Sequence, residues 1–340
     1  MKKLLLIALF FFIIVLAACG NSDDADAGES GDSGEGGSWE PEESIEIVAP
    51  AGAGGGWDTT ARMVAKVLGE EGMIEENIGV VNKTGGGGAV GWSYIANYEG
   101  DPHKLFVASP PIILIPLNGQ SEYGHEDFIP LSNLIADYGA FAVREDAEWD
   151  DLNDLFEDMK EDPESVTVVG ESAPGSMDHI QFVQIAKAAG VDITKIRYVS
   201  AQDGESLTQL LNGSVDVYST GMAETVEQVK ADNIKVLGIT APERLEGEVI
   251  EDFPTAIEQG IDETFVNWRG FFGPPGMDEA SIAYYEDKFK ELSDSEAFAE
   301  IRDQFGWDEE YMGHEEYKAF LDEQKEQVQV LLDDLGLNNE

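Results

Sequence analysis

Short apolar runs alternate with amphipathic segments along most of this 340-residue chain. Residues 45–48 form a β-branched run that predicts a strand, and the apolar residues between 61 and 68 have the i, i+3, i+4, i+7 spacing of a helix. Further strands are predicted at 78–81, 105–108, 166–169, 196–199, 215–218, 234–239 and 266–273. Further helices are predicted to end near Tyr98, to end before Gly190, to start near Gly221, or to span 149–159, 206–211, 278–292 and 315–335. Strands that alternate with helices indicate an α/β fold with mostly parallel sheets flanked by helices.

The longest apolar stretch of the expected fold, residues 128–143, predicts two strands with Asp137-Tyr138-Gly139 between them. We interpret it as a crossing from one domain into another, and residues 266–273 as the return crossing. The length of the chain also suits about two domains. The first domain is expected to comprise 44–143 plus 267–340 and the second 144–266, with a cleft between them. The two last helices should pack on the first domain.

A glycine-rich loop, residues 49–56, connects the first predicted strand to its helix. Free N–H groups at a helix N-terminus carry partial positive charge, and glycine lets the backbone approach an anion closely. A flexible connector without a ligand is the alternative. Glycine loops at 82–91 and 170–176, and the strand ends at Ser109 and Ser219, lie beyond the carboxyl ends of predicted strands, where α/β sheets bind ligands. Facing helix N-termini from both domains would clamp an anion.

The composition is strongly acidic, with 69 Asp and Glu against 20 Lys and Arg and a formal net charge of −49. Nucleic-acid binding requires basic patches, so we exclude it as a function class. This balance is typical of a saline or alkaline exterior, where salt screens the self-repulsion of the chain. The alternative is that acid enrichment marks lineage and says nothing about the ligand.

The N-terminal segment is expected to lie outside the fold. Two lysines precede an apolar run and a small-residue site, which together predict a signal peptide over 1–18. Leu16-Ala17-Ala18-Cys19 resembles the bacterial lipobox, so Cys19 is predicted to carry two acyl chains; an incidental cysteine after an ordinary signal peptide is the alternative. Residues 19–43 predict an acidic disordered tether. The protein is therefore expected on the outer face of the cytoplasmic membrane, held by lipid.

Motifs of cofactor, metal and catalytic sites are incomplete in this sequence. The G-x-G-x-x-G fingerprint fails at Trp57 and Thr59, and the P-loop-like spacing from Gly170 to Gly175 lacks its lysine. The four histidines are scattered, and no HExxH motif is present. We predict no catalytic residue, no cofactor and no metal ion. Under the enzyme alternative His179 would be the base, although a local packing or capping role is favoured.

Several motifs, taken together, resemble one family. They are Ala49-Pro50-x-Gly52 with Gly55-Gly56-Trp57-Asp58 and Arg62, Gly86 to Gly91, Asp137-Tyr138-Gly139 with Ala142-Val143-Arg144, Gly175-Ser176, Arg197-Tyr198-Val199, Val215-Asp216-Val217, Pro254-Thr255 with Glu258-x-Gly260, and Trp268-Arg269-Gly270-Phe271. From about Ser44 onward the chain is similar to the extracytoplasmic solute receptors of tripartite tricarboxylate transporters, the TctC or Bug family. The resemblance implies a two-domain, type II periplasmic-binding-protein fold. It also implies a monomeric receptor, not an enzyme, that delivers a carboxylate to membrane permease subunits.

The resemblance further implies which residues bind the ligand. The family grips a carboxylate with the first strand–helix loop and the second-domain loop, here residues 54–59 and Gly175-Ser176, with Ser172 a weaker match. Similarity to the citrate-type branch suggests citrate or another tricarboxylate; a dicarboxylate or an aromatic acid is the alternative. Arg269 would hold a second carboxylate unless it forms a hinge salt bridge. The expected ligand-binding set is Gly54, Gly55, Gly56, Trp57, Asp58, Thr59, Gly87, Ser109, Tyr138, Ser172, Gly175, Ser176, Ser219 and Arg269.

Overall fold

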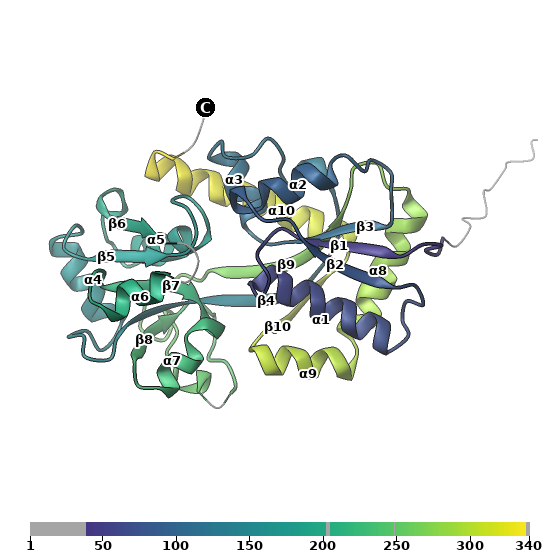
Figure 1. Cartoon of the computed structure of the whole chain (residues 1–340). Coiled ribbons are helices and arrows are strands. Elements are labelled where there is room, and N and C mark those ends of the chain that lie inside the picture. The colour runs from purple at the N-terminus through teal and green to yellow at the C-terminus, as the bar shows by residue number, and fades with distance from the viewer. Residues whose placement is uncertain (1–38, 202–204, 248, 338–340) are drawn as a thin grey trace, which may run out of the picture. The chain divides into compact units, whose positions relative to one another are not determined.

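The computed structural model describes residues 39–201, 205–247 and 249–337, which all belong to one compact unit (Figure 1). The predicted signal peptide, Cys19 and most of the predicted tether lie outside the described residues. Within the described ranges, no helix is both long enough and apolar enough to cross a membrane.

The described residues form a mixed α/β structure, as the sequence predicts. The strands are β1 (Ile45–Ala49), β2 (Ile78–Asn82), β3 (Lys104–Ala108), β4 (Ile129–Arg144), β5 (Thr167–Gly170), β6 (Arg197–Ser200), β7 (Val217–Gly221), β8 (Ile234–Ile239), β9 (Val266–Gly273) and β10 (Asp308–Met312). The α-helices are α1 (Gly56–Glu70), α2 (Ala89–Ile95), α3 (Pro111–Leu117), α4 (Leu152–Glu161), α5 (Met177–Ala188), α6 (Glu205–Leu211), α7 (Val226–Lys230), α8 (Glu279–Ser293), α9 (Glu296–Phe305) and α10 (His314–Leu335). Helices α3 and α9 and strand β10 are not predicted by the hydrophobic pattern of the sequence.

The sheet has the strand order β2-β1-β3-β9-β4-β7-β5-β6, with β8 and β10 also paired to β4. On one side β2, β1 and β3 are parallel, and on the other β6, β5 and β7 are parallel. Strands β4 and β9 run antiparallel to their neighbours between these two sets. We call the part around β1–β3 the first lobe and the part around β5–β8 the second lobe (Figure 1).

A single strand, β4, crosses from one lobe to the other. Its residues up to Tyr138 pair with β9, and from Gly139 onward they pair with β7 and β8. The prediction of two strands separated at residues 137–139 is therefore wrong. The strand stays continuous because both of its halves have neighbouring strands to pair with. Gly139 lets Gln181 approach closely, since a Cβ at this position would lie 2.3 Å from Oε1 of Gln181.

Each lobe has its own apolar core, to which β4 contributes from both halves. Leu134 packs with Val64 of α1 and Phe289 of α8 in the first lobe, whereas Phe141 packs with Phe182 of α5 in the second. Helix α10 also joins the lobes. Its Tyr317 lies in a first-lobe cluster, but Leu331 and Leu332 belong to the second-lobe core. The prediction that this last helix packs on the first domain is thus correct only for its N-terminal half.

Candidate functional site

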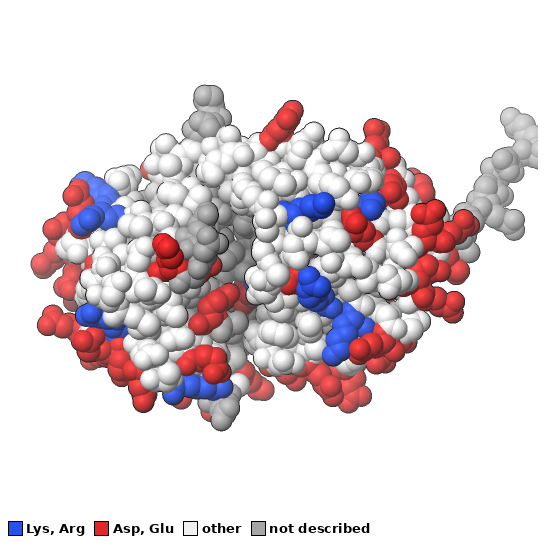
Figure 2. All heavy atoms as spheres, viewed as in Figure 1, with Lys and Arg blue, Asp and Glu red and all other residues white. Residues whose placement is uncertain are grey.

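The N-termini of α1 and α5, one from each lobe, open onto a shared cavity of about 240 Å³. Figure 2 shows the furrow between the lobes and the acidic side chains spread over both. The lining residues are Gly56, Trp57, Gly87, Ser109, Pro111, Glu171, Ser172, Ser176, Met177, Asp178, Thr220, Gly221, Glu224, Asn267 and Arg269. A space of this size suits a small molecule.

Asp58, in the first turn of α1, holds the glycine loop in place. Its carboxylate accepts hydrogen bonds from the backbone N–H of Gly54 at 2.8 Å, from Asn82 Nδ2 at 2.8 Å and from Arg62 Nε at 3.0 Å. Burial opposes ionisation of this group, but the bonds from Arg62, Gly54 and Asn82 outweigh it and keep the pKa of Asp58 below its usual range. The carboxylate is 3% exposed and positions the loop.

Asp178, at the start of α5, holds the second-lobe loop in a similar way. Its carboxylate accepts from the backbone N–H groups of Glu171 and Ser172, both at 2.9 Å. The Ser172 hydroxyl in turn accepts from the Asp178 N–H at 2.8 Å. Burial raises the pKa of Asp178 to about 6. The N-cap residue of α5 is Ser176, whose hydroxyl makes no bond to the first helical turn and therefore remains available to a ligand.

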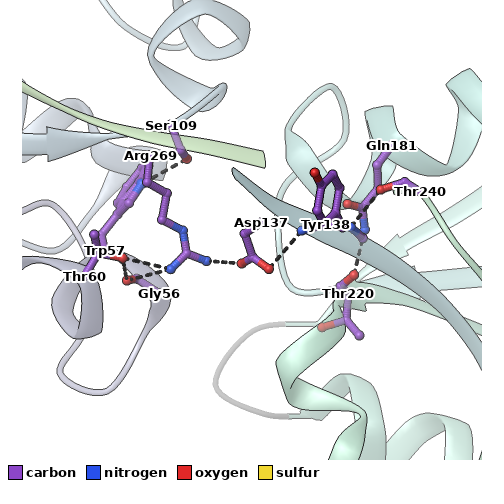
Figure 3. Close-up of polar contacts among 11 residues, drawn as sticks. Gly56, Trp57, Thr60, Ser109, Asp137, Tyr138, Gln181, Thr220, Thr240 and Arg269 are labelled. Carbon is purple, nitrogen blue, oxygen red and sulfur yellow. Dashed lines mark hydrogen bonds and ion pairs between the residues drawn. The ribbon is translucent and has the colours of Figure 1, made fainter. Parts of the chain in front are cut away.

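Backbone and side-chain donors of the first lobe face the same space. Gly56 and Trp57 are the first residues of α1, so their N–H groups have no acceptor within the helix. The indole N–H of Trp57 donates to Ser109 Oγ at 2.9 Å, which leaves the Ser109 hydroxyl free to donate its own proton (Figure 3). The two lobes thus present N–H and O–H donors to one small volume.

Arg269 is held by the protein itself. Its guanidinium forms an ion pair with Asp137 and donates to Gly56 O and Thr60 Oγ1, both at 3.0 Å (Figure 3). Burial raises the pKa of Asp137, and the charge of Arg269 opposes that rise. The side chains of Arg269 and Asp137 are 8% and 3% exposed, respectively. Arg269 thus forms a buried salt bridge, although one edge of it still lines the cavity; its role at a hinge stays a prediction.

Carboxylates contribute much of the remaining polar lining. Glu171 and Asp178 come from the α5 loop, and Glu224 comes from the 3-10 turn η4 (Met222–Glu224) after β7. Loss of hydration, followed by the nearby charge of Asp137, raises the pKa of Glu224 to about 7. Glu224 is nevertheless exposed to solvent, which moderates this effect. The cavity therefore combines donors with an unexpected number of acids.

The structure brings part of the predicted ligand-binding set together. The cavity is lined by Gly56, Trp57, Gly87, Ser109, Ser172, Ser176 and Arg269, but not by Gly54, Gly55, Asp58, Thr59, Tyr138, Gly175 or Ser219. The Tyr138 hydroxyl instead donates to Asp308 at 2.9 Å. Ser219 donates to the backbone oxygen of Asp178 at 2.7 Å. The assignment of any of these residues as a ligand contact stays a prediction.

His179 lies beside the cavity but does not line it. Its Nδ1 accepts from the Gly175 N–H at 3.0 Å, and its ring packs against Tyr198 with 4.5 Å between centroids. Burial lowers its pKa to about 4, so the imidazole is neutral at neutral pH. This arrangement matches the local packing role that the sequence analysis favoured.

Several lining residues were missed by sequence reasoning. They are Pro111, Glu171, Met177, Asp178, Thr220, Gly221, Glu224 and Asn267. Most follow a strand or loop already identified, so the rule that ligands bind beyond strand ends could have included them. Asn267 stands within β9, and Glu224 belongs to no motif that the sequence analysis identified. Only the fold brings these two to the cavity.

One group of side chains within the described residues is arranged closely enough to hold a metal ion. It comprises His125, Glu126 and Asp322, none of which lines the cavity. Glu126 is already paired with Lys325 at 2.6 Å.

Comparison with known proteins identifies the family. Residues 60–337 match the model of the tripartite tricarboxylate transporter family receptor. A protein of Agrobacterium vitis, named for the TAR-I ttuE-ttuC' intergenic region, is 26% identical over 249 residues; the match covers 69% of this chain and 66% of that relative, just under two thirds of its length.

Two solved structures from Rhodopseudomonas palustris share the fold. Rpa4515 with adipate has a TM-score of 0.75 at 19% identity, covering 87% of this chain and 98% of that one. MatC with bound malate has a TM-score of 0.69 at 21% identity, covering 87% and 99%. At these identities the structures establish a two-domain solute-binding fold, while the family match spans most of the chain. The chain therefore belongs to the tripartite tricarboxylate transporter receptor family, a family of solute-binding receptors.

Proposed function

We propose that this protein captures a small carboxylate between its two lobes and delivers it to the membrane permease of a tripartite tricarboxylate transporter. The observation that carries this proposal is the convergence of two helix N-termini, from α1 and α5, on one cavity. Each N-terminus carries about half a positive charge and directs free N–H groups outward. A carboxylate between them would receive donors from both lobes.

The ligand's carboxylate would contact Gly56 and Trp57 through their N–H groups, and Ser109 and Ser176 through their hydroxyls. Because these donors come from different lobes, binding would favour the closed arrangement. The two lobes are joined by β4, by the chain entering β9 and by α10, so a hinge motion at these connections would admit and release the ligand. The boundaries 44–143 plus 267–340 and 144–266 remain our proposal for the moving parts.

For the ligand itself we propose a di- or tricarboxylate. The bound malate of MatC and the adipate of Rpa4515 are dicarboxylates, and the sequence resemblance adds citrate. Delivery to a permease fits a monomer held at the outer face of the cytoplasmic membrane by lipid on Cys19, which we also propose from the sequence.

A thermal-shift panel tests the carboxylate proposal. The purified protein is heated with succinate, glutarate, malate, adipate, citrate, aspartate, glutamate and benzoate, at low and high salt. A ligand at 100 times its Kd stabilises the fold by about 2.7 kcal/mol, which raises the melting temperature by several degrees. The proposal fails if no carboxylate shifts the melting temperature while a sugar or a simple amine does.

Two serine-to-alanine variants test where the carboxylate binds. Ser176→Ala removes a hydroxyl in the cavity, whereas Ser93→Ala makes the same change at an exposed position of α2. For any carboxylate that binds, calorimetry should show weaker binding only for Ser176→Ala. Equal affinities in the two variants would place the carboxylate elsewhere.

A further inference from the structure

The cavity holds more negative charge than a simple carboxylate receptor needs. Of the described residues that line it, only Arg269 carries a positive charge, and its guanidinium is already paired with Asp137. Glu171, Asp178 and Glu224 line the same space. A ligand that carried only negative charge would add to this repulsion, which a small, partly enclosed volume screens poorly.

A buried acceptor without a donor lies among these acids. Asn267 is 3% exposed, lines the cavity, and sits on β9 two residues before Arg269. Within the described residues its Oδ1 has no hydrogen-bond partner. A side-chain amide oxygen can only accept, and leaving it unsatisfied in a buried place is costly. The site therefore needs a donor that the described protein does not supply.

Glu224 supplies a second acceptor, which is exposed to solvent and accepts a backbone N–H. Among the described residues, no lysine, arginine or histidine forms an ion pair with it. Its carboxylate lies close over Gly221, where a Cβ would be 2.5 Å from Oε2, so the glycine lets the acid fold back against β7. Loss of hydration and the nearby charge of Asp137 raise its pKa to about 7, and the charge of Arg269 opposes that rise only in part.

The cavity thus has two unlike faces. The α1 and α5 N-termini, with Ser109 and Ser176, offer donors, whereas Asn267 and Glu224 offer acceptors, with Glu171 adding negative charge. Resting on the carboxylate-receptor function above, we propose that the ligand is a zwitterion, whose carboxylate contacts the helix N-termini and whose ammonium group donates to Asn267 Oδ1 and Glu224.

A metal ion accompanying a carboxylate is a different source of positive charge, and the geometry favours it less. The ligand atoms of Glu171, Asp178 and Glu224 do not all lie within 4.8 Å of one another, whereas those of His125, Glu126 and Asp322 do. Divalent cations gather several oxygens in one shell. An ammonium group needs only separate acceptors for its three N–H donors.

Matched ligands test the proposal by calorimetry at pH 8 with EDTA, where ammonium groups and Glu224 are charged. Each carboxylate that binds is compared with counterparts carrying an ammonium or a hydroxyl group: succinate with aspartate and malate, and glutarate with glutamate and 2-hydroxyglutarate. We expect the amino member to bind at least about tenfold tighter than both counterparts, as for one hydrogen bond between charged groups. Equal or weaker binding of the amino member overturns the zwitterion proposal and leaves the carboxylate receptor intact.

Two further arms separate the remaining outcomes. If magnesium or calcium, added in place of EDTA, makes the plain carboxylate bind as tightly as the amino member, the cation is a metal ion and the ammonium proposal is overturned. If no carboxylate of any kind binds, the proposed function fails as well. Glu224→Gln should reduce the preference for the amino member about tenfold, while Glu157→Gln, at an exposed position of α4, should leave it unchanged. An unchanged preference in Glu224→Gln would remove Glu224 from the ammonium site.

Discussion

Replacing Arg269 with methionine should destabilise the protein strongly even without ligand. The substitution removes the charge opposite Asp137 and the two 3.0 Å bonds to Gly56 O and Thr60 Oγ1. Both members of the ion pair are almost fully buried. Removing one partner of such a pair leaves an uncompensated charge and costs about 3–5 kcal/mol. For a folded part of about 300 residues that corresponds to a fall in melting temperature of roughly 5–8 °C.

The loss should depend on pH in a defined direction. Burial raises the pKa of Asp137, and removal of Arg269 takes away the charge that opposes this rise. In Arg269→Met the folded protein should therefore bind a proton at Asp137 that the unfolded chain binds only at lower pH. Stability relative to wild type then falls as pH rises through the interval between the unfolded and folded pKa values. The deficit should be largest at neutral pH and shrink on acidification.

Urea unfolding of the ligand-free protein between pH 5 and 8 measures these effects. Arg197→Met, at an exposed position of β6, is the control for loss of a surface arginine. Asp137→Asn should be destabilising alone, because it leaves Arg269 unpaired, yet it should recover much of the loss when added to Arg269→Met. A loss below about 1 kcal/mol in Arg269→Met, or no recovery in the double variant, would contradict the ion-pair argument.

The remaining predictions concern the ligand, the loop and the membrane. Ser176→Ala should weaken carboxylate binding by about 1–2 kcal/mol in calorimetry, with little change in the melting temperature of the ligand-free protein. Gly56→Ala should lower the free energy of unfolding in urea by about 1–3 kcal/mol, because the new Cβ would lie 2.7 Å from Arg269 Nη2. The control Gly69→Ala adds a Cβ with nothing within 4 Å and should stabilise α1 slightly. Binding measured by titration should tolerate or prefer high salt, which screens the acidic surface; a steep loss of affinity would contradict this. Cys19→Ala should release the protein from membranes or leave it unprocessed on cell fractionation; wild-type protein that is wholly soluble and unlipidated would refute the anchor.

Periodicity and strand-to-helix loops were sufficient to predict most of the fold. The strand 45–48 and the helix after its glycine loop are confirmed as β1 and α1, because β-branched runs and apolar stripes are local signals. Helix α3 was missed because Pro111 and Pro116 suggest a break, although a proline is acceptable in the first helical turn. The two-strand interpretation of 128–143 failed because pairing partners, which sequence does not reveal, keep the strand continuous.

The candidate site was less predictable, because pairing between distant residues decides which groups remain free. Asp58 was expected to contact the ligand, but its hydrogen-bonding capacity is used by Gly54, Arg62 and Asn82. Conversely, the amide oxygen of Asn267 lacks a donor among the described residues, and the sequence around Asn267 gives no sign of this. A motif identifies the residue types near a ligand, whereas the three-dimensional contacts determine which of their atoms are unoccupied.

The position of the Arg269–Asp137 pair supports our proposal that backbone donors contact the carboxylate. Asp137 lies on β4 just before this strand changes lobes, and Arg269 lies on the neighbouring β9 while bonding the first turn of α1. The pair therefore ties the crossing strands to the helix whose N-terminus faces the cavity. An arginine that fixes this junction cannot also swing onto a ligand without leaving Asp137 buried and charged. In a chain with so few cations, helix N-termini supply positive potential at the cavity while Arg269 stays paired with Asp137.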